Sequence, residues 1–183
     1  KSDDQYSLEG DRGMCDDKST FVVLGMGLLG AAICGRLIAS GQRVVGFDVA
    51  EGQRKKLGEA GGSSVESAND VVDSCRVVVL SLPTSKIVLS VIDQLPSRLH
   101  EKTIVIDTTT GDPDQMVAAA DRLAERAAGY LEANVAGSSK QLASGEATLF
   151  IGGETATVER VEADLDTLAT QRFHLGPVGS ASR

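Results

Sequence analysis

Short runs of β-branched and aliphatic residues alternate with segments of helical periodicity along most of this 183-residue chain. Such alternation is typical of βαβ units, in which helices cover both faces of a parallel sheet. The predicted strands are Thr20–Leu24, Arg43–Phe47, 76–82, 103–106, 130–135 and 148–151, with weaker strands near Ser64 and Phe173. The predicted fold class is therefore α/β, with a doubly wound and mostly parallel sheet.

The predicted helices begin and end at recognisable residues. They cover residues 28–40, 52–60, 113–128 and 155–169. Glycines are expected to end the first three, at Gly41, at Gly61 with Gly62, and at Gly129. Asp112 followed by Pro113 predicts the start of the third helix, because an Asp side chain caps free amides and proline needs no donor in the first turn.

The composition indicates one globular domain with an aliphatic core. Hydrophobic residues make up 42% of the chain, and the aromatic residues are four Phe and two Tyr, with no Trp. Such a core suits buried parallel strands. Residues 1–18 are polar and acid-rich, which predicts a flexible arm, and residues 19–183 are predicted to form the folded domain.

The net charge of −8 at pH 7 argues against nucleic acid and membrane partners, since both bind through a basic surface. No apolar run is long enough to span a bilayer, and no signal peptide is expected. Cys15, Cys34 and Cys75 form no CxxC pair, so neither a metal site nor a complete disulfide framework is predicted. Cys34 and Cys75 are expected in the core, and a reducing cytoplasm is the expected location.

The segment FVVLGMGLLGAAICGRL places a GxGxxG pattern between a predicted strand and a predicted helix. In this context Gly25 permits a tight turn, Gly27 lets backbone approach a pyrophosphate, and Gly30 lets the helix pack on the strand. The residues predicted to contact a dinucleotide here are Gly25, Met26, Gly27, Leu28, Leu29 and Gly30. A tight turn without a ligand is the alternative.

Asp48 ends the second predicted strand, eighteen residues after Gly30. A carboxylate at this position can accept hydrogen bonds from the ribose hydroxyls of the adenosine and would repel a 2′-phosphate. The predicted cofactor is therefore NAD rather than NADP, although Arg54, Lys55 and Lys56 could soften that preference. The alternative is that Asp48 only serves the turn.

Two further polar segments follow predicted strands, at the sheet edge where open α/β proteins bind ligands. The first, LPTSK, contains Leu82, Pro83 and Thr84, and the second, IDTTTGDP, contains Thr108, Thr109 and Thr110. Leu82, Pro83, Thr84 and Thr110 are predicted to contact the cofactor. The threonines could instead cap the helix at Pro113.

With these segments in order, residues 20–183 resemble the β-hydroxyacid dehydrogenases, specifically the 3-hydroxyisobutyrate dehydrogenase and tartronate semialdehyde reductase group. The matching segments are GMGLLG, FDV, LPTS, IDTTTGDP, EANVAGSSKQLASGEATLFIGG and HLGPVG. The resemblance implies a Rossmann-type NAD-binding domain with extra strands. It also implies a helical C-terminal domain that is expected to be absent from this chain and to mediate homo-oligomer formation.

The segment that the resemblance assigns to the substrate departs from the family pattern. Where the family has Asp-Ala-Pro-Val-Ser-Gly-Gly, this chain has residues 132–138 as EANVAGS. The predicted substrate contacts are Ala136, Gly137 and Ser138, of which Ala136 lacks the family's hydroxyl. Similarly, Ile87 stands where the family often has a cofactor-binding asparagine.

Alcohol oxidation also needs a group that takes the hydroxyl proton. His100 and His174 are poorly placed for this role, and the resemblance implies a lysine about two positions beyond Arg183. No catalytic residue is therefore predicted within the chain. The predicted function is the NAD-binding domain of an enzyme that oxidises a small β-hydroxyacid by hydride transfer. A non-catalytic dinucleotide-sensing or interaction module and an imine reductase are the alternatives.

Overall fold

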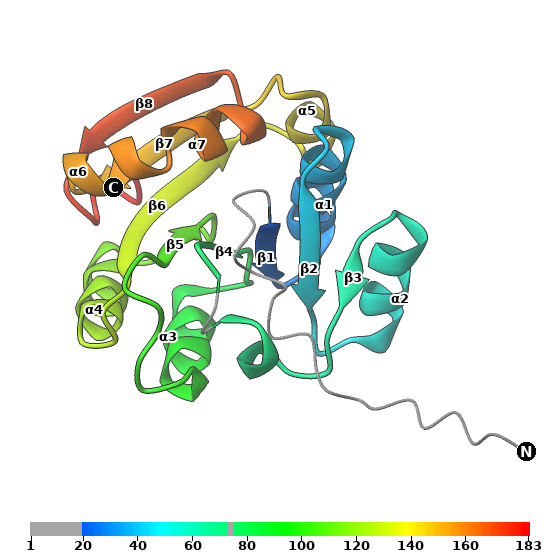
Figure 1. The fold of residues 1–183 in the computed structure, drawn as a ribbon. Coiled ribbons are helices and arrows are strands. Elements are labelled where there is room, and N and C mark those ends of the chain that lie inside the picture. Colours follow the sequence, from blue (N-terminus) through cyan, green and yellow to red (C-terminus); the bar gives the residue numbers. More distant parts are fainter. Residues whose placement is uncertain (1–19, 73–74) are drawn as a thin grey trace, which may run out of the picture.

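The computed structural model describes residues 20–72 and 75–183, so the predicted arm at residues 1–18 lies outside the described part. Its centre is one sheet of eight strands (Figure 1). The strands are β1 Thr20–Leu24, β2 Arg43–Phe47, β3 Ser63–Ser64, β4 Val77–Leu80, β5 Ile104–Asp107, β6 Gly129–Ala136, β7 Thr148–Gly153 and β8 Gln171–Gly176. The helices are α1 Leu28–Ala39, α2 Glu51–Glu59, the 3-10 turn η1 Ala68–Asp70, α3 Ser85–Gln94, α4 Pro113–Ala124, α5 Ser139–Ser144, α6 Thr155–Arg160 and α7 Glu162–Leu168.

The strand order across the sheet is β3-β2-β1-β4-β5-β6-β7-β8. Strands β1 to β6 pair in parallel, β7 is antiparallel to β6, and β8 is parallel to β7. The predicted α/β class with a mostly parallel sheet is confirmed. After β3 the chain crosses to the other side of β1, so the loops after β1 and β4 diverge and leave a crevice at the carboxyl edge.

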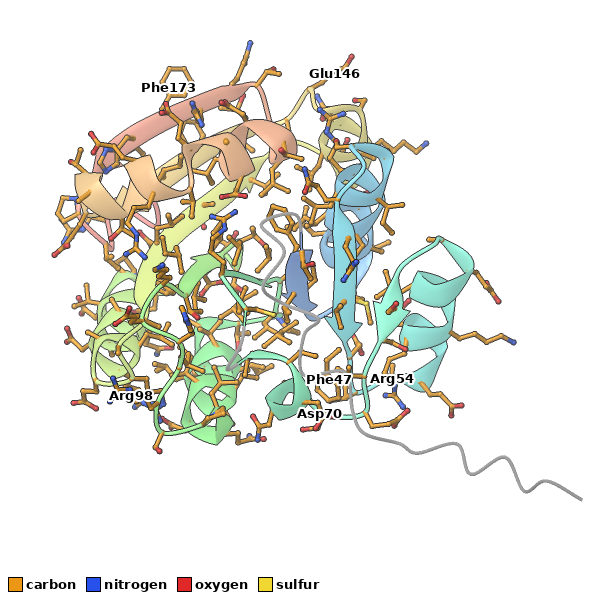
Figure 2. The ribbon with its side chains drawn as sticks, viewed as in Figure 1. Phe47, Arg54, Asp70, Arg98, Glu146 and Phe173 are labelled. Carbon is orange, nitrogen blue, oxygen red and sulfur yellow. The ribbon has the colours of Figure 1, made fainter. Side chains whose placement is uncertain are left out.

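Helices cover both faces of the sheet, as a doubly wound fold requires. Alternate strand residues point to opposite faces, so that Val23 and Val79 pack with α1, α5 and α7, while Val22 and Val78 pack with α3 and α4. All four valines are essentially inaccessible to solvent. The outer strand β8 is less covered, and Phe173 projects from it toward solvent (Figure 2).

Several helix predictions were wrong in detail. The helix after Pro113 ends at Ala124, because Ala127 turns the chain with a φ of 63°, and Gly129 begins β6 instead of ending the helix. The predicted helix 155–169 is two helices, α6 and α7, which meet at Val161 with a φ of −120°. Val161 stays buried, so the apolar spacing passes through the break unchanged. Helices α3 and α5 were not predicted.

The turn from β1 into α1 is built by direct backbone packing. Gly25 has a φ of 90°, and a Cβ atom there would lie 2.3 Å from the carbonyl oxygen of Ser81. A Cβ atom on Gly30 would lie 2.0 Å from the carbonyl oxygen of Gly25. Neither oxygen can move without disturbing the backbone, so both positions exclude every side chain.

Because the obstacle at Gly30 is backbone, we expect Gly30→Ala to lower the free energy of unfolding by about 2 kcal/mol or more. Gly35 lies in the same helix and has open space where its Cβ would be, so Gly35→Ala should stabilise the protein by about 0.5–1 kcal/mol through helix propensity. Urea denaturation of both variants measures the two effects. Equal stability of Gly30→Ala and wild type would contradict the close-packed turn.

Candidate functional site

A cleft of about 660 Å³ opens at the crevice between the loops that follow β1 and β4. Loops after β2 and β5 and the turn η1 complete its walls. The volume is typical of small-molecule and cofactor sites. The cleft therefore lies at the sheet edge where the sequence predicted ligand binding.

The glycine loop forms one wall of this cleft. Gly27 precedes α1 in an extended conformation, no side chain caps the helix there, and a Cβ on Gly27 would have no neighbour within 4 Å. Gly25, Leu28 and Leu29 also border the cleft. A helix start of this kind offers unpaired N–H donors and a partial positive charge to an anion.

Two residues predicted to contact the cofactor lie behind this wall. The side chain of Met26 is buried, and Gly30 is buried against the turn. Neither borders the cleft, and their roles in the described structure are packing and turn geometry.

Asp48 borders the cleft and ties two loops together. Its Oδ2 accepts a hydrogen bond from the Met26 N–H at 2.7 Å, and its Oδ1 accepts one from the Ala50 N–H at 2.8 Å. A carboxylate oxygen can accept two hydrogen bonds, so each oxygen retains capacity for a ligand hydroxyl. Asp48 therefore serves its own turn and is still able to bind a ribose.

The loops after β4 and β5 form the opposite wall. Leu82, Pro83 and Thr110, which are predicted to contact the cofactor, border the cleft together with Ile87. Thr84 does not border the cleft, because its hydroxyl oxygen caps α3 by accepting the Ile87 N–H at 3.3 Å. Ile87, in α3, places an apolar side chain at the cleft where the family often has asparagine.

The threonines at 108 and 109 connect the strand ends. The Thr108 hydroxyl donates to the Leu80 carbonyl at 2.8 Å, and the Thr109 hydroxyl oxygen accepts the Leu82 N–H at 3.1 Å. The cap of α4 is instead Asp112, which accepts N–H groups from its first turn. The alternative in which Thr108 or Thr109 caps that helix is therefore wrong.

Comparisons with known proteins confirm the suspected relationship. The family described as the NAD binding domain of 6-phosphogluconate dehydrogenase matches the chain over residues 20–176. The chain belongs to this NAD-binding family. Its named relatives include β-hydroxyacid dehydrogenases, as the sequence resemblance implied.

Among its relatives, this NAD-binding domain is 30% identical over 162 residues to an NAD-dependent L-serine dehydrogenase of Pseudomonas aeruginosa, covering 86% of the chain and 54% of the relative. It is 26% identical over 177 residues to the cytokine-like nuclear factor N-PAC of Drosophila melanogaster, covering 94% of the chain and 29% of the relative. The structure of Mycobacterium tuberculosis 3-hydroxyisobutyrate dehydrogenase with L-serine matches with a TM-score of 0.86 and 26% identity, covering 90% of the chain and 56% of that structure. The chain thus spans 29% to 56% of the lengths of these proteins.

The segment assigned to the substrate lies outside the cleft wall of the NAD-binding domain. Ala136 ends β6, and Ser138 caps α5 in a capping box with Gln141. The Ser138 N–H donates to Gln141 Oε1 at 2.9 Å, and the Ser138 hydroxyl oxygen accepts the Gln141 N–H at 3.2 Å. Gly137 between them has a φ of 143°. Two groups expected to bind a substrate carboxylate are therefore already used within α5.

A buried glutamate that the sequence did not single out holds the segment after β8. Glu132 accepts hydrogen bonds through Oε2 from the Gly179 N–H at 2.8 Å and the Ala181 N–H at 3.3 Å. Its Oε1 accepts the Ser182 hydroxyl at 2.6 Å. The chain beyond β8 is thus fastened to β6 by a carboxylate, through partners about fifty residues away in sequence, which no local pattern reveals.

A second buried acid lies beside it. Asp107 is paired with Glu132 in the β5–β6 register and accepts hydrogen bonds from the Thr109 N–H and the Tyr130 hydroxyl, both at 2.9 Å. Burial raises the pKa of Asp107 from 3.8 to about 6, and the charge of Glu132 adds to the rise, against the opposing effect of these hydrogen bonds. Asp107 links the core to the wall of the cleft through Thr109.

Other site classes have little support in the described residues. Residues 20–72 and 75–183 contain no group of three or more His, Cys, Asp or Glu side chains placed to hold a metal ion. In the same ranges, no helix combines the length and apolar character needed to cross a membrane. Cys34 and Cys75 are buried as expected, and burial raises the pKa of the Cys34 thiol to about 12.

The raised pKa of Asp107 predicts a specific pH dependence of stability. A group whose pKa is higher in the folded state contributes fully below its unfolded value near 3.8, and the contribution is lost as pH rises through about 6. Relative to Asp107→Asn, wild type should lose up to about 3 kcal/mol of unfolding free energy between about pH 4 and pH 7.

Urea denaturation at several pH values measures this difference. Asp121→Asn, at an exposed position on α4, is the matched control and should give a nearly constant difference from wild type. Parallel stability curves for wild type and Asp107→Asn would contradict the raised pKa.

Proposed function

We propose that the cleft binds NAD, with its pyrophosphate at the start of α1 and its adenosine ribose on Asp48. The observation that carries the proposal is that Gly27, open and uncapped, and the Asp48 carboxylate border the same cleft. The first offers N–H donors to phosphate, and the second offers acceptors to hydroxyls. Gly25, Leu28, Leu29, Leu82, Pro83 and Thr110 are the further proposed contacts.

The charges around the cleft favour NAD over NADP. The cleft is bordered by two carboxylates, Asp48 and Glu66, and none of the described residues that border it is Lys, Arg or His. A 2′-phosphate near Asp48 would therefore meet like charge without a neighbouring cation in the wall.

We further propose that this domain serves an enzyme that oxidises the alcohol of a small β-hydroxyacid, with bound NAD as the hydride acceptor. The L-serine dehydrogenase and 3-hydroxyisobutyrate dehydrogenase relatives support this substrate class. None of the described residues that border the cleft is Lys or His, and the family resemblance implies a lysine as the group that takes the hydroxyl proton. Homo-oligomer formation through the helical domain stays a prediction.

One observation favours a second function, that of a non-catalytic dinucleotide-binding module. Ala136 lacks the family's hydroxyl, and the N–H and hydroxyl of Ser138 are used in the capping box of α5. Little of the expected carboxylate site then remains. One relative, similar over 94% of the chain, carries the name of a cytokine-like nuclear factor and not that of a dehydrogenase.

Binding of NADH to this chain tests the cofactor proposal. Gly27→Val should fold with a loss of at most about 1 kcal/mol, since its Cβ meets open space, but should weaken NADH binding at least about tenfold by filling the pyrophosphate position. Calorimetric titration gives the affinity, and Gly35→Ala, also in open space, is the control that should bind normally. Unchanged binding by Gly27→Val would place the pyrophosphate elsewhere.

Activity separates the two functions. We expect this chain alone to bind NADH without turnover, and a chain extended through the implied helical domain to form NADH from NAD with L-serine, 3-hydroxyisobutyrate or glycerate. The increase in NADH absorbance measures the reaction. NADH binding with no oxidation of any of the three by the extended protein would support the non-catalytic module, and reduction of cyclic imines would support the imine reductase alternative.

A further inference from the structure

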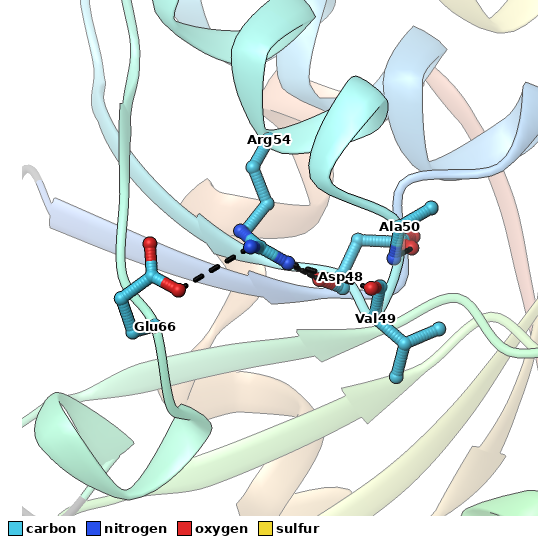
Figure 3. Close-up of polar contacts among 5 residues, drawn as sticks. All are labelled: Asp48, Val49, Ala50, Arg54 and Glu66. Carbon is cyan, nitrogen blue, oxygen red and sulfur yellow. Dashed lines mark hydrogen bonds and ion pairs between the residues drawn. The ribbon is translucent and has the colours of Figure 1, made fainter.

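Arg54, on the first turn of α2, contacts the loop that carries Asp48, where the ribose is proposed to bind. Its Nη1 donates to the Asp48 carbonyl oxygen at 2.7 Å and to the Val49 carbonyl oxygen at 3.5 Å (Figure 3). Its Nη2 forms an ion pair with Glu66 Oε2 at 3.3 Å. The guanidinium is therefore held between the loop after β2 and the segment that leads to η1.

The ion pair leaves the two partners in different surroundings. The side chain of Arg54 is 15% exposed, whereas that of Glu66 is 89% exposed. Glu66 borders the cleft together with Asp48, and Arg54 does not. Glu66 thus lies in the wall of the cleft, while Arg54, whose positive charge neutralises that of Glu66, lies behind the wall.

An ion pair with one partner this exposed contributes little to folding stability, because water screens it. Its effect on a bound charge is a separate matter, since together with the two carbonyl oxygens it fixes the direction of the guanidinium. Arginine is the side chain best suited to bind a phosphate through paired N–H groups. Held against two carbonyl oxygens and a carboxylate, Arg54 has three of its five N–H donors engaged.

We propose that Glu66 determines cofactor choice by holding Arg54 away from the position of a 2′-phosphate and by adding its own negative charge beside Asp48. This inference rests on the proposed binding of NAD in the cleft. NADP would have to bring its phosphate between two carboxylates and break the Arg54–Glu66 pair to gain a cation. NAD has a hydroxyl at that position and needs neither change.

The proposal predicts that Glu66→Gln frees the Nη2 group of Arg54 to face a 2′-phosphate, while Nη1 stays on the Asp48 carbonyl, and that it removes one repulsive charge. NADPH should then bind about tenfold more tightly, while the affinity for NADH changes less than about twofold. Calorimetric titration of wild type and variant with both dinucleotides gives the ratio of the two affinities. Glu59→Gln, at the exposed end of the same helix α2, is the matched control for loss of one negative charge and should leave the ratio unchanged.

A double variant separates the two parts of the proposal. In Arg54→Met with Glu66→Gln, no guanidinium is available, so most of the gain in NADPH affinity should disappear. Retention of the whole gain in the double variant, or an unchanged ratio in Glu66→Gln, would overturn the proposed holding of Arg54. The outcome in which wild type binds neither NADH nor NADPH is distinct, because it would overturn the proposed function and this inference together.

Discussion

The cleft depends on backbone packed directly against backbone at the start of α1. The carbonyl oxygens of Gly25 and Ser81 occupy the space where side chains on Gly30 and Gly25 would begin. The Gly25 N–H also donates to the Phe47 carbonyl, and the Ser81 N–H donates to the Leu24 carbonyl, both at 2.9 Å. Three chain segments meet here with no side chain between them, and this contact sets where the helix amides lie relative to Asp48.

Local patterns were sufficient to predict the centre of the fold. The β-branched residues of β1 and β2 gave the bounds of both strands, and Asp112 with Pro113 gave the start of α4, since each signal acts within a few residues. The break between α6 and α7 at Val161 leaves the apolar spacing intact, so the sequence pattern could not predict it. Helix α5 has a visible signal in Ser138 and Gln141, which form a capping box three residues apart.

In the candidate site, too, the residues with a local sequence signal could be predicted and those that depend on distant segments could not. Gly27 and Asp48 could be predicted, because the glycine spacing and the following acid reflect local turns. Thr84 follows a strand, as a cofactor-binding residue would, but in the structure its hydroxyl oxygen caps α3. Glu132 and Asp107 could not be predicted, because their importance comes from partners in distant segments and from burial that only the assembled sheet creates.

The hydrogen bonds of Glu132 with Gly179, Ala181 and Ser182 also affect how the chain folds. These contacts span 47 to 50 residues, whereas the segments that border the cleft are complete once β5 and the loop after it have formed. During synthesis, the cleft can assemble while Glu132 still has no hydrogen-bond donors for its carboxylate. Because a buried carboxylate without hydrogen-bond donors is costly, the buried position of Glu132 becomes favourable only when these donors are in place. Burial of a charge in the middle of the sheet is thereby coupled to the arrival of the residues that follow β8.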